Sequence, residues 1–526
     1  MTLSAGAGAG VGGGPAADAA ALQARFDALQ ARLVPLWSSM QSMTDDEQTI
    51  VVVPSLSLDL VEGSGLIVQP YEERMLFLLF LLRQPRARMV YVTSEPILPS
   101  VVDYYLDLIP DVPHHHARRR LDLVPVLDPS SRPLSAKLLE RPRLLERIRG
   151  LVADPARAHL VPFITTDLER DLALHLGIPM YGSDPRFGDY GTKTGGRRLF
   201  EEEGVAHPIG RRDLWSLDAV VDAVVELRAQ KPALAQVIVK LNEGVSGDGN
   251  AVVDLGAVPP PGDPGEVAAV RAAVEAMQFE AGTTLAAYVA TLERWGGVVE
   301  ERIQGHGFVS PSVQLRVTPL GELELLSTHD QMLGGPSGQA YLGCVFPADA
   351  AYAPLISAEA AKVGRRLARE GVLGRFALDF VAVRNDADEW EGYAIEVNLR
   401  KGGTTHPFLT LSYLTDGTYD PETATFTTPA GETKHLVASD HVDSPDYRGL
   451  TPDDVFDAVV RHGLHWDKAR QVGVVFHMLS ALTSQGHLGM TAIGNSPEHA
   501  RELYDRAVAV LDAEGAAAMA PRPLPD

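Results

Sequence analysis

The feature that most constrains the fold is an alternation of short strands and helices within residues 49–164. Apolar and β-branched runs at 49–54, 89–93, 121–127 and 159–164 are predicted strands. The segments between them, 71–82, 101–109 and 134–149, are predicted helices. Alternating strands and helices form a parallel sheet with helices on its faces, so we expect an α/β domain. Because no glycine-rich phosphate turn follows these strands, we expect the domain to act as a scaffold and to contribute to the substrate side.

The segment before this domain divides into two parts. Residues 1–17 are rich in glycine and alanine, a composition typical of disordered low-complexity sequence. Leucine and phenylalanine then recur every three or four positions, which predicts one amphipathic helix over residues 22–36. We expect this helix to pack on the body of the protein or to form a homodimer contact. No basic segment followed by an apolar run occurs at the amino terminus, so no signal peptide is expected.

Charge and cysteine content disfavour several classes of protein. The chain has 46 basic and 69 acidic residues and a net charge of −23, which disfavours nucleic acid and anionic membranes as partners. A single cysteine, Cys344, leaves no intrachain disulfide and is typical of a reducing, cytoplasmic compartment. The longest dense apolar run, residues 75–82, is far shorter than the ~20 residues that a membrane helix needs. The length of 526 residues allows roughly three domains.

Acidic and amide side chains lie on two predicted strands in the second half of the chain. Asp379 lies on one strand, and Glu396 and Asn398 lie on the next. Because strand side chains alternate between faces, Glu396, Asn398 and Arg400 share one face. Carboxylates on such apolar strands are costly to bury unless they are paired or bind a metal. Two carboxylates and an amide oxygen suit Mg²⁺, so we expect a Mg²⁺ site that serves ATP, with a cation beside it.

A glycine-rich loop follows another predicted strand. The strand over 236–240 ends in Lys240, and the loop after it contains Ser246, Gly247 and Gly249. Glycine lets backbone N–H groups approach phosphate oxygens, and the lysine adds a positive charge. The Walker A pattern of phosphate-binding loops is absent. This segment therefore predicts a phosphate contact, with an ordinary surface hairpin as the alternative.

Two further segments carry charged candidates. Lys193 lies in a basic, glycine-rich stretch just before a helix predicted over 199–203, where a cation opposes the helix dipole. That mild cost favours an anionic ligand, and an ordinary solvated lysine is the alternative. Glu300 and Glu301 follow a β-branched run, where a carboxylate can accept hydrogen bonds from an amino group or ribose hydroxyls. A surface acidic pair is the alternative there.

Taken in order, these four features resemble the ATP-grasp superfamily. The resemblance covers about residues 181–407. The motifs GTKTGGRRLF (191–200), KLNEGVSGDGN (240–250) and IEVNLRKGGTTHP (395–407) are similar to those of the pheganomycin-type peptide ligases. The resemblance implies a pre-ATP-grasp α/β domain over 18–184, then a two-lobed α+β ATP-grasp fold with a small lobe at 185–300 and a large lobe at 301–414, and finally a C-terminal extension over 415–526.

The resemblance also implies roles for the candidate residues. Lys193 and Lys240 would contact the ATP phosphates, and the loop with Ser246, Gly247 and Gly249 would close over them. A hinge that includes Glu300, Glu301 and Ile303 would hold adenine, and Asp379, Glu396 and Asn398 would hold Mg²⁺.

This sequence departs from the pattern at two positions. Gly307 stands where many members have an acidic residue for ribose, so Glu301 or His306 would replace it. Ala377 stands where many have a catalytic arginine. Arg316, Arg375 or Arg400 could supply that charge, and Arg400 is favoured because it shares the face of the metal ligands. The catalytic candidates are therefore Arg400, Arg316 and Lys240.

Two segments are candidates for substrate contacts. Residues 400–403, which are Arg400, Lys401, Gly402 and Gly403, suit a carboxylate because arginine binds carboxylates bidentately and glycine permits close approach. A loop over 330–338 is expected near the acceptor, with Ser337 as a polar contact, and a purely structural loop is equally compatible. His477 is expected to be a core histidine with its hydrogen bonds satisfied, and residues 486–494 are expected to wall the substrate site.

The activity implied is an ATP- and Mg²⁺-dependent ligation of a carboxylate to an amine or peptide through an acylphosphate. ADP and phosphate would be released, and peptide natural-product biosynthesis is the expected setting. A carboxylate kinase or a thioester ligase on the same fold is one alternative. A non-catalytic nucleotide-binding protein is another.

Overall fold

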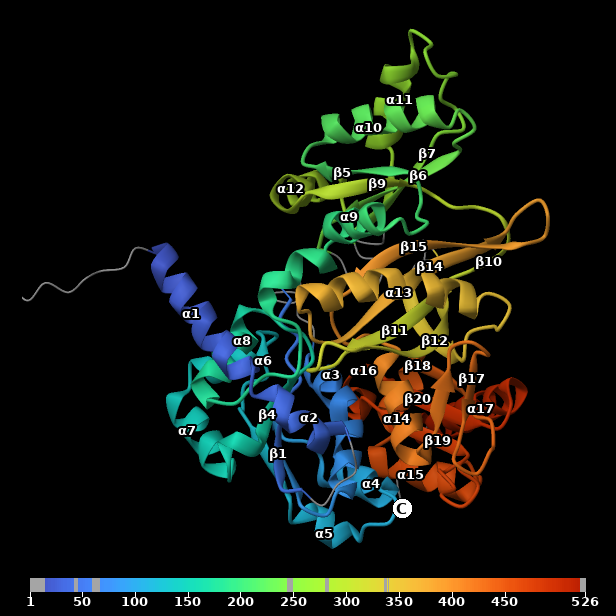
Figure 1. Cartoon of the computed structure of the whole chain (residues 1–526). Helices are drawn as coiled ribbons and strands as arrows, with labels where there is room; N and C mark the ends of the chain where they lie inside the picture. Colours follow the sequence, from blue (N-terminus) through green and yellow to red (C-terminus); the bar gives the residue numbers. More distant parts are fainter. Residues whose placement is uncertain are drawn as a thin grey trace, which may run out of the picture.

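The computed structural model describes residues 15–41, 46–58, 67–243, 249–279, 283–334, 338 and 340–520. The chain runs from a first domain, through a small lobe and a large lobe, to a C-terminal region that returns to lie beside the first domain (Figure 1). No helix in these residues is long and apolar enough to cross a membrane.

The first domain contains a four-stranded sheet in the order β3-β2-β1-β4, and all three pairings are parallel. This confirms the parallel sheet predicted from the alternation of strands and helices. The strands are β1 (Gln48–Val53), β2 (Ala87–Thr93), β3 (Leu121–Pro125) and β4 (Ala158–Pro162). The helices around them are α4 (Pro99–Leu108), α5 (His114–Arg118), α6 (Leu134–Leu139), α7 (Pro142–Leu151) and α8 (Asp167–Leu176).

Two predicted helices of this domain have a different form. The segment predicted as one helix over 134–149 is divided into α6 and α7, because Pro142 starts a new helix at its first turn. The segment predicted over 71–82 consists of α3 (Gln69–Glu73) and a 3-10 helix, η1 (Arg74–Arg83). Seven of the ten η1 side chains are buried, so this element lies inside the protein rather than on its surface.

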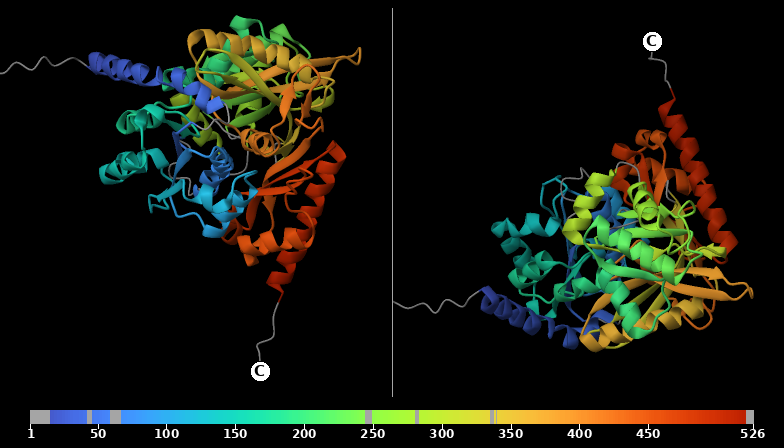
Figure 2. Two further views of the ribbon diagram at one scale, coloured as in Figure 1. Left: turned by 60° about the horizontal axis from the view of Figure 1, so that its bottom comes forward. Right: turned by 90° about the horizontal axis from the view of Figure 1, so that it is seen from above.

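The amphipathic segment at the start forms two helices, α1 (Pro15–Gln30) and α2 (Leu33–Gln41). Phe26, Leu33 and Trp37 are buried, so this segment packs on the body of the protein. Gln30 fastens α1 through hydrogen bonds to the backbone of Met180. Helix α1 begins at Pro15, inside the stretch 1–17, and residues 1–14 lie outside the described residues. In both views of Figure 2, α1 and the last helix, α17 (Pro497–Met519), lie on opposite sides of the molecule.

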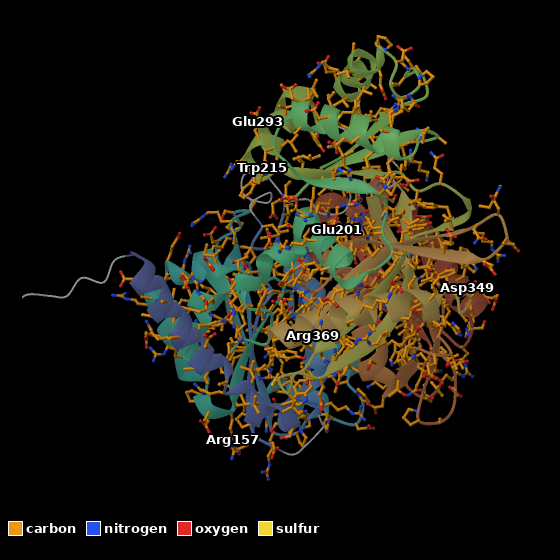
Figure 3. The ribbon with its side chains drawn as sticks, turned by 45° about the horizontal axis from the view of Figure 1, so that its top comes forward. Arg157, Glu201, Trp215, Glu293, Asp349 and Arg369 are labelled. Carbon is orange, nitrogen blue, oxygen red and sulfur yellow. The ribbon has the colours of Figure 1, made fainter. Side chains whose placement is uncertain are left out.

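The small lobe is a five-stranded antiparallel sheet in the order β5-β9-β6-β7-β8. Its strands are β5 (Gly210–Leu214), β6 (Gln236–Leu241), β7 (Asn250–Asp254), β8 (Gln278–Phe279) and β9 (Gly297–Glu301). Its helices are α9 (Lys193–Glu203), α10 (Leu217–Gln230), α11 (Glu266–Glu275) and α12 (Leu285–Trp295). Figure 3 places Trp215 and Glu293 on this lobe and Asp349 and Arg369 on the large lobe.

The large lobe and the C-terminal region share one sheet of nine strands. Its order is β10-β14-β11-β12-β13-β18-β20-β19, with β15 paired to β14. The pairing of β13 with β18 joins the two regions, so the C-terminal extension continues the large-lobe sheet. The strands are β10 (His306–Val309), β11 (Pro311–Val317), β12 (Leu323–Gly334), β13 (Ala340–Phe346), β14 (Gly374–Arg384), β15 (Trp390–Asn398), β18 (His435–Asp443), β19 (Gly473–His477) and β20 (His487–Gly494).

The remaining elements cover this sheet or connect its strands. The helices are α13 (Ala353–Glu370), α14 (Thr405–Thr415), α15 (Pro452–Arg461) and α16 (Leu482–Gln485), and the hairpin is β16 (Thr418–Asp420) with β17 (Thr425–Thr427). The largest apolar core is shared between the two ends of the chain. It includes Ile50 and Phe80 of the first domain together with Phe476 and Leu511 of the C-terminal region. The last hundred residues therefore complete the packing of the first domain.

Candidate active site

A cavity of about 1260 Å³ lies where the first domain, the two lobes and the C-terminal region meet. Ligand sites for one small molecule typically have about 300–1,000 Å³, so the cavity has room for a nucleotide and a second substrate. The predicted residues that line it are Lys193, Lys240, Glu300, Glu301, Ile303, Asp379, Glu396, Asn398, Arg400, Gly402 and Gly403.

The predicted metal ligands come together on β14 and β15. Asp379 is directly opposite Glu396, and Asn398 is opposite Ala377, two positions before Asp379. The Asn398 side-chain amide donates to Asp379 Oδ2 at 2.9 Å, and Gln331 of β12 donates to Asp379 Oδ1 at the same distance. Gln331 was missed from the sequence, because residues 330–338 were predicted to be a loop, whereas β12 continues to Gly334.

The charges at this centre suit a divalent cation. Burial and the neighbouring Glu396 raise the pKa of Asp379. Burial acts in the same direction on Glu396, but Lys193 and Arg400 outweigh it and lower the pKa of Glu396. Two carboxylates at opposed strand positions are costly to bury together, and a bound cation would remove that cost. The residues present therefore fit the Mg²⁺ that the sequence predicted.

Lys193 reaches this centre from the first turn of α9. Its Nζ lies 2.5 Å from Glu396 Oε1. Helix α9 begins at Lys193, whereas the sequence predicted a helix only from residue 199, because Gly195 and Gly196 have low helix propensity. Gly195 is needed for close packing, since a Cβ there would lie 1.8 Å from the Asp189 carbonyl oxygen. Gly195 thus lets the start of α9 pack against the Asp189 backbone, while Gly196 lies against Val397 of β15.

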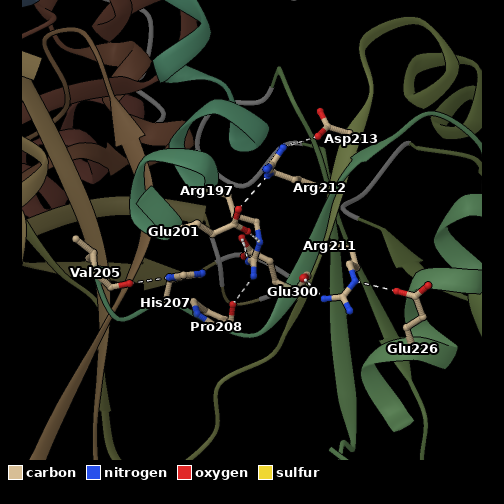
Figure 4. A network of polar contacts seen from close by, with 11 residues as sticks. Arg197, Glu201, Val205, His207, Pro208, Arg211, Arg212, Asp213, Glu226 and Glu300 are labelled. Carbon is tan, nitrogen blue, oxygen red and sulfur yellow. Dashed lines mark hydrogen bonds and ion pairs between the residues drawn. The ribbon is translucent and has the colours of Figure 1, made fainter. Parts of the chain in front are cut away.

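Lys240 and Glu300 form a second buried cluster with Arg197. Figure 4 shows Arg197 and Glu300 of this cluster. Lys240 Nζ lies 2.6 Å from Glu300 Oε2, and Arg197 Nη1 lies 3.4 Å from Glu300 Oε1. Arg197 also donates to the Pro208 carbonyl at 2.9 Å, which fixes its position. Each of the three side chains is at most 6 % exposed. Glu300 is thereby neutralised by two cations, one of which lines the cavity.

Only some of the other residues of the predicted nucleotide site line the cavity. Glu301 pairs with Lys231, and Ile303 lines the cavity. Glu301 lines the cavity and His306 does not, so Glu301 is the better placed of the two ribose candidates. Gly249 has φ of 87°, and its carbonyl accepts from the Leu241 backbone and the Tyr288 hydroxyl. Ser246, Gly247 and the substrate candidate Ser337 lie outside the described residues.

Two predicted cations do not reach the cavity. Arg316 donates from Nε to Glu324 at 2.6 Å and lies over the Trp37 ring at 5.0 Å. Lys401 donates from Nζ to the Pro162 carbonyl at 2.6 Å, and burial lowers the pKa of Lys401 to about 7. Neither belongs to the cavity lining. The catalytic role expected for Arg316 and the substrate role expected for Lys401 are therefore not favoured, because Glu324 on the adjacent strand occupies Arg316 and the distant Pro162 carbonyl occupies Lys401.

Arg400 does reach the centre. It lines the cavity, and its charge acts on both Asp379 and Glu396. Gly403, close by in the chain, is packed against Tyr341, since a Cβ there would lie 2.6 Å from the tyrosine ring. The strand over 487–494 does not line the cavity, contrary to the expectation for residues 486–494, whereas Gln485 just before it does.

The cavity wall also contains part of a buried cluster that the sequence did not predict as a site. Arg74 Nη1 lies 2.8 Å from Asp440 Oδ2, and Asp440 Oδ1 lies 2.7 Å from His477 Nε2 and 3.1 Å from His406 Nε2. His477 is 4 % exposed. Arg74 and Asp440 line the cavity. The cluster joins η1, α14, β18 and β19, which are too far apart in the chain for any sequence motif.

Comparison with known proteins identifies the family. A model described as IQCH-like, ATP-grasp matches residues 188–259 and 266–422, and a model of the PGM1 C-terminal domain matches 454–507. The L-propargylglycine--L-glutamate ligase of Streptantibioticus cattleyicolor is 30% identical over 452 residues, covering 84% of this chain and 88% of that protein. The chain belongs to the ATP-grasp family of ligases.

Other similarities extend beyond this ligase. IQ motif-containing protein H of Danio rerio is 24% identical over 456 residues, which cover 78% of this chain but only 43% of that protein. An ADP complex of N5-carboxyaminoimidazole ribonucleotide synthetase has a TM-score of 0.50 at 11% identity, covering 89% of this chain and 97% of its own. A biotin carboxylase–β,γ-ATP complex from Campylobacter jejuni has a TM-score of 0.52 at 12% identity, with 91% and 97% covered. These ATP-grasp structures share the fold, which confirms the predicted architecture.

Proposed function

We propose that this ATP-grasp protein joins the carboxylate of one amino acid or peptide to the amine of another, using ATP and Mg²⁺. The observation that carries the proposal is the pair of carboxylates Asp379 and Glu396, surrounded by Lys193, Lys240 and Arg400, in a cavity larger than one ligand requires. The similarity to L-propargylglycine--L-glutamate ligase, whose name gives two amino acids as substrates, supports this substrate class.

The proposed reaction has two steps. A carboxylate oxygen of the first substrate attacks the γ-phosphorus of ATP, the bond to the β,γ-bridging oxygen breaks, and ADP leaves. The amine of the second substrate then attacks the acylphosphate carbon, phosphate leaves with the C–O electron pair, and the amine nitrogen loses a proton. Each cycle therefore forms one amide bond and releases ADP and phosphate.

The residues of this chain act by position and charge. Asp379, Glu396 and Asn398 would hold Mg²⁺, which supplies positive charge to the transferring phosphoryl group. Lys193, Lys240 and Arg400 offset the negative charge that spreads over the same group, and burial strengthens their effect. No covalent enzyme intermediate is required, so the protein contributes mainly orientation and exclusion of water.

The test is ADP release from MgATP with pooled amino acids and short peptides, followed by mass spectrometry of the products. A product equal in mass to both substrates minus water supports the ligase. An ¹⁸O-labelled carboxylate should then transfer one ¹⁸O atom to the released phosphate. Formation of AMP and pyrophosphate, or phosphate release that no amine stimulates, would contradict the proposal and favour an adenylating enzyme or a carboxylate kinase.

A further inference from the structure

The end of the cavity formed by the first domain combines apolar walls with one positive charge. Six apolar or aromatic side chains of that domain line it, namely Leu56, Leu58, Ile67, Tyr71, Phe163 and Ile164. Arg74 is the charged residue that the described part of this domain adds to the lining. A ligand that fits this end therefore has an anionic group and an uncharged, apolar portion.

The Arg74 guanidinium is held in place from several directions. It lies 5.4 Å from the Tyr71 ring centre and 5.0 Å from the Phe163 ring centre. Nη1 donates to Asp440, and no other hydrogen bond of this guanidinium is found within the described residues. Its side chain is 10% exposed. An arginine that is oriented by aromatic rings and keeps N–H groups available is well suited to bind a carboxylate.

The buried cluster behind Asp440 fixes this arginine further. His406 and His477 both direct Nε2 to Asp440 Oδ1, so one carboxylate oxygen is held by two histidines while the other holds Arg74. Burial lowers the pKa of His406 to about 3, which favours its neutral form. Gly489 leaves space for His477, because a Cβ at that position would lie 2.1 Å from Nε2. Asp440, His406 and His477 are thus positioning residues for Arg74.

Arg74 and Arg400 both line the cavity. Arg400 follows Asn398 of the metal centre by two positions and lines the cavity, whereas Arg74 is paired with Asp440. A carboxylate to be phosphorylated belongs beside Arg400. A second, unreactive carboxylate fits Arg74.

We propose that Arg74 binds the carboxylate of the amine-bearing substrate, so that the acceptor is an α-amino acid with an apolar side chain rather than a simple amine. In an α-amino acid the amine and the carboxylate are attached to the same carbon. Anchoring the carboxylate at Arg74 therefore directs the amine toward the acylphosphate formed beside Arg400. This inference rests on the proposed ligase function.

The test compares amino acids with their decarboxylated counterparts: L-leucine with 3-methylbutan-1-amine, and L-phenylalanine with 2-phenylethanamine. Loss of a hydrogen-bonded charge contact corresponds to about 10- to 100-fold in affinity. We expect the native protein to prefer each amino acid by at least about 10-fold in kcat/KM. In Arg74→Gln the preference should fall to about threefold or less, while the KM values for ATP and the acid stay within about threefold.

Two control variants separate recognition from folding. Arg83→Gln removes another arginine of η1, which pairs with Asp416 outside the cavity, and should keep the full preference. Arg74→Lys keeps a positive charge beside Asp440. This variant should keep part of the preference for the amino acid over its amine. An unchanged preference in Arg74→Gln, or a raised KM for the acid instead of the amine, would overturn the inference.

A binding measurement makes the result independent of turnover. Calorimetric titration of the same four compounds in the presence of ADP and Mg²⁺ reports affinity directly. Amino-acid binding that is lost in Arg74→Gln, without ADP release under any condition, would support carboxylate binding by Arg74 and reject the ligase proposal together with the acceptor role. Failure of the native protein to bind either amino acid more tightly than its amine would reject the inference, whatever the turnover.

The cluster of His406, Asp440 and His477 needs a separate test, because its side-chain donor atoms are also close enough together to hold a transition metal. Metal analysis of the purified protein should find less than about 0.1 equivalent of zinc, copper, nickel or iron that depends on His406 and His477. One tightly bound equivalent that disappears in His477→Ala would overturn the hydrogen-bonded arrangement.

Discussion

Lys240 of β6 and Glu300 of β9 form a buried ion pair, with Nζ 2.6 Å from Oε2 and both side chains almost fully enclosed. Arg197 shares the same carboxylate from α9, so one anion holds two cations. The lysine expected to meet the ATP phosphates is therefore placed before any nucleotide arrives. Such preorganisation is the main means by which a charged site favours phosphoryl transfer.

Glu300→Gln should destabilise the protein. The change leaves Lys240 and Arg197 buried without their shared anion, and breaking a buried pair in this way costs about 3–5 kcal/mol. Guanidinium unfolding should show this loss, and the double variant Lys240→Met/Glu300→Gln should recover part of it. Glu301→Gln is the matched control. Its partner Lys231 is half exposed, so a loss of less than about 1 kcal/mol is expected.

Glu396→Gln should remove most of the activity while leaving the fold intact. The change removes one of the two carboxylates proposed to hold Mg²⁺ and also the ion-pair partner of Lys193. Loss of one such electrostatic contact typically lowers kcat by about 100-fold or more. Steady-state kinetics over a range of Mg²⁺ concentrations should show this loss. Glu391→Gln on the same strand, which binds Tyr393 and Asn385 instead, should keep kcat; equal rates in both variants would contradict the proposed site.

Arg316→Gln should leave catalysis unchanged. Arg316 lies outside the cavity lining and is paired with Glu324, and both side chains are partly exposed. An ion pair of this kind contributes about 1 kcal/mol or less to stability. We expect kcat and KM within about twofold of the native values, together with a small fall in melting temperature. A large loss of kcat would reinstate Arg316 as a catalytic residue.

Gly489→Ala should disturb Arg74 from a distance. The new methyl group would lie 2.1 Å from His477 Nε2, so His477 must move away from Asp440. Overpacking of this kind destabilises proteins by about 1–3 kcal/mol. The variant should also lose preference for carboxylate-bearing amines, with ATP affinity unchanged. Gly150→Ala, where no atom lies within 4 Å, is the control and should show neither effect.

Stability should fall in mild acid because of buried histidines. Burial lowers the pKa of His159 from 6.5 to about 4, so the unfolded chain binds the extra proton first as the pH falls. Between pH 6.5 and 4 the contribution lost is about 1.4 kcal/mol per pH unit. Unfolding at pH 7 and pH 5 should show a smaller difference in His159→Gln than in the native protein. His462→Gln, an exposed position, should keep the native pH slope.

Local patterns in the sequence predicted much of the site and the fold. The alternation of strands and helices determined the parallel sheet, and the two-residue period placed Glu396 and Asn398 on one face. The start of α9 was missed because Gly195 and Gly196 are poor helix formers. Their use there is close packing against Asp189 and β15, which only the folded structure reveals.

Contacts between distant residues could not be predicted in the same way. Lys401 was expected to bind substrate, but its partner is a carbonyl 239 positions earlier in the chain. Arg74 and Asp440 are 366 positions apart, and Arg74 lies at the start of an apolar run that indicated only a helix. Such pairs depend on how whole domains are placed against one another, and no single segment encodes that placement.

Because the two ends of the chain share one core, the core of the first domain cannot be fully packed until the C-terminal region has been synthesised. The apolar side chains of η1 emerge early, but the core to which they belong also includes Phe476 and Leu511, which emerge near the end of synthesis. At about 5–20 residues per second, the ribosome would need roughly 20–80 s to supply them. An apolar surface of the first domain is uncovered during that interval. Expression of that domain alone should therefore yield an aggregating product, and a ribosome-associated chaperone would have its longest contact with η1.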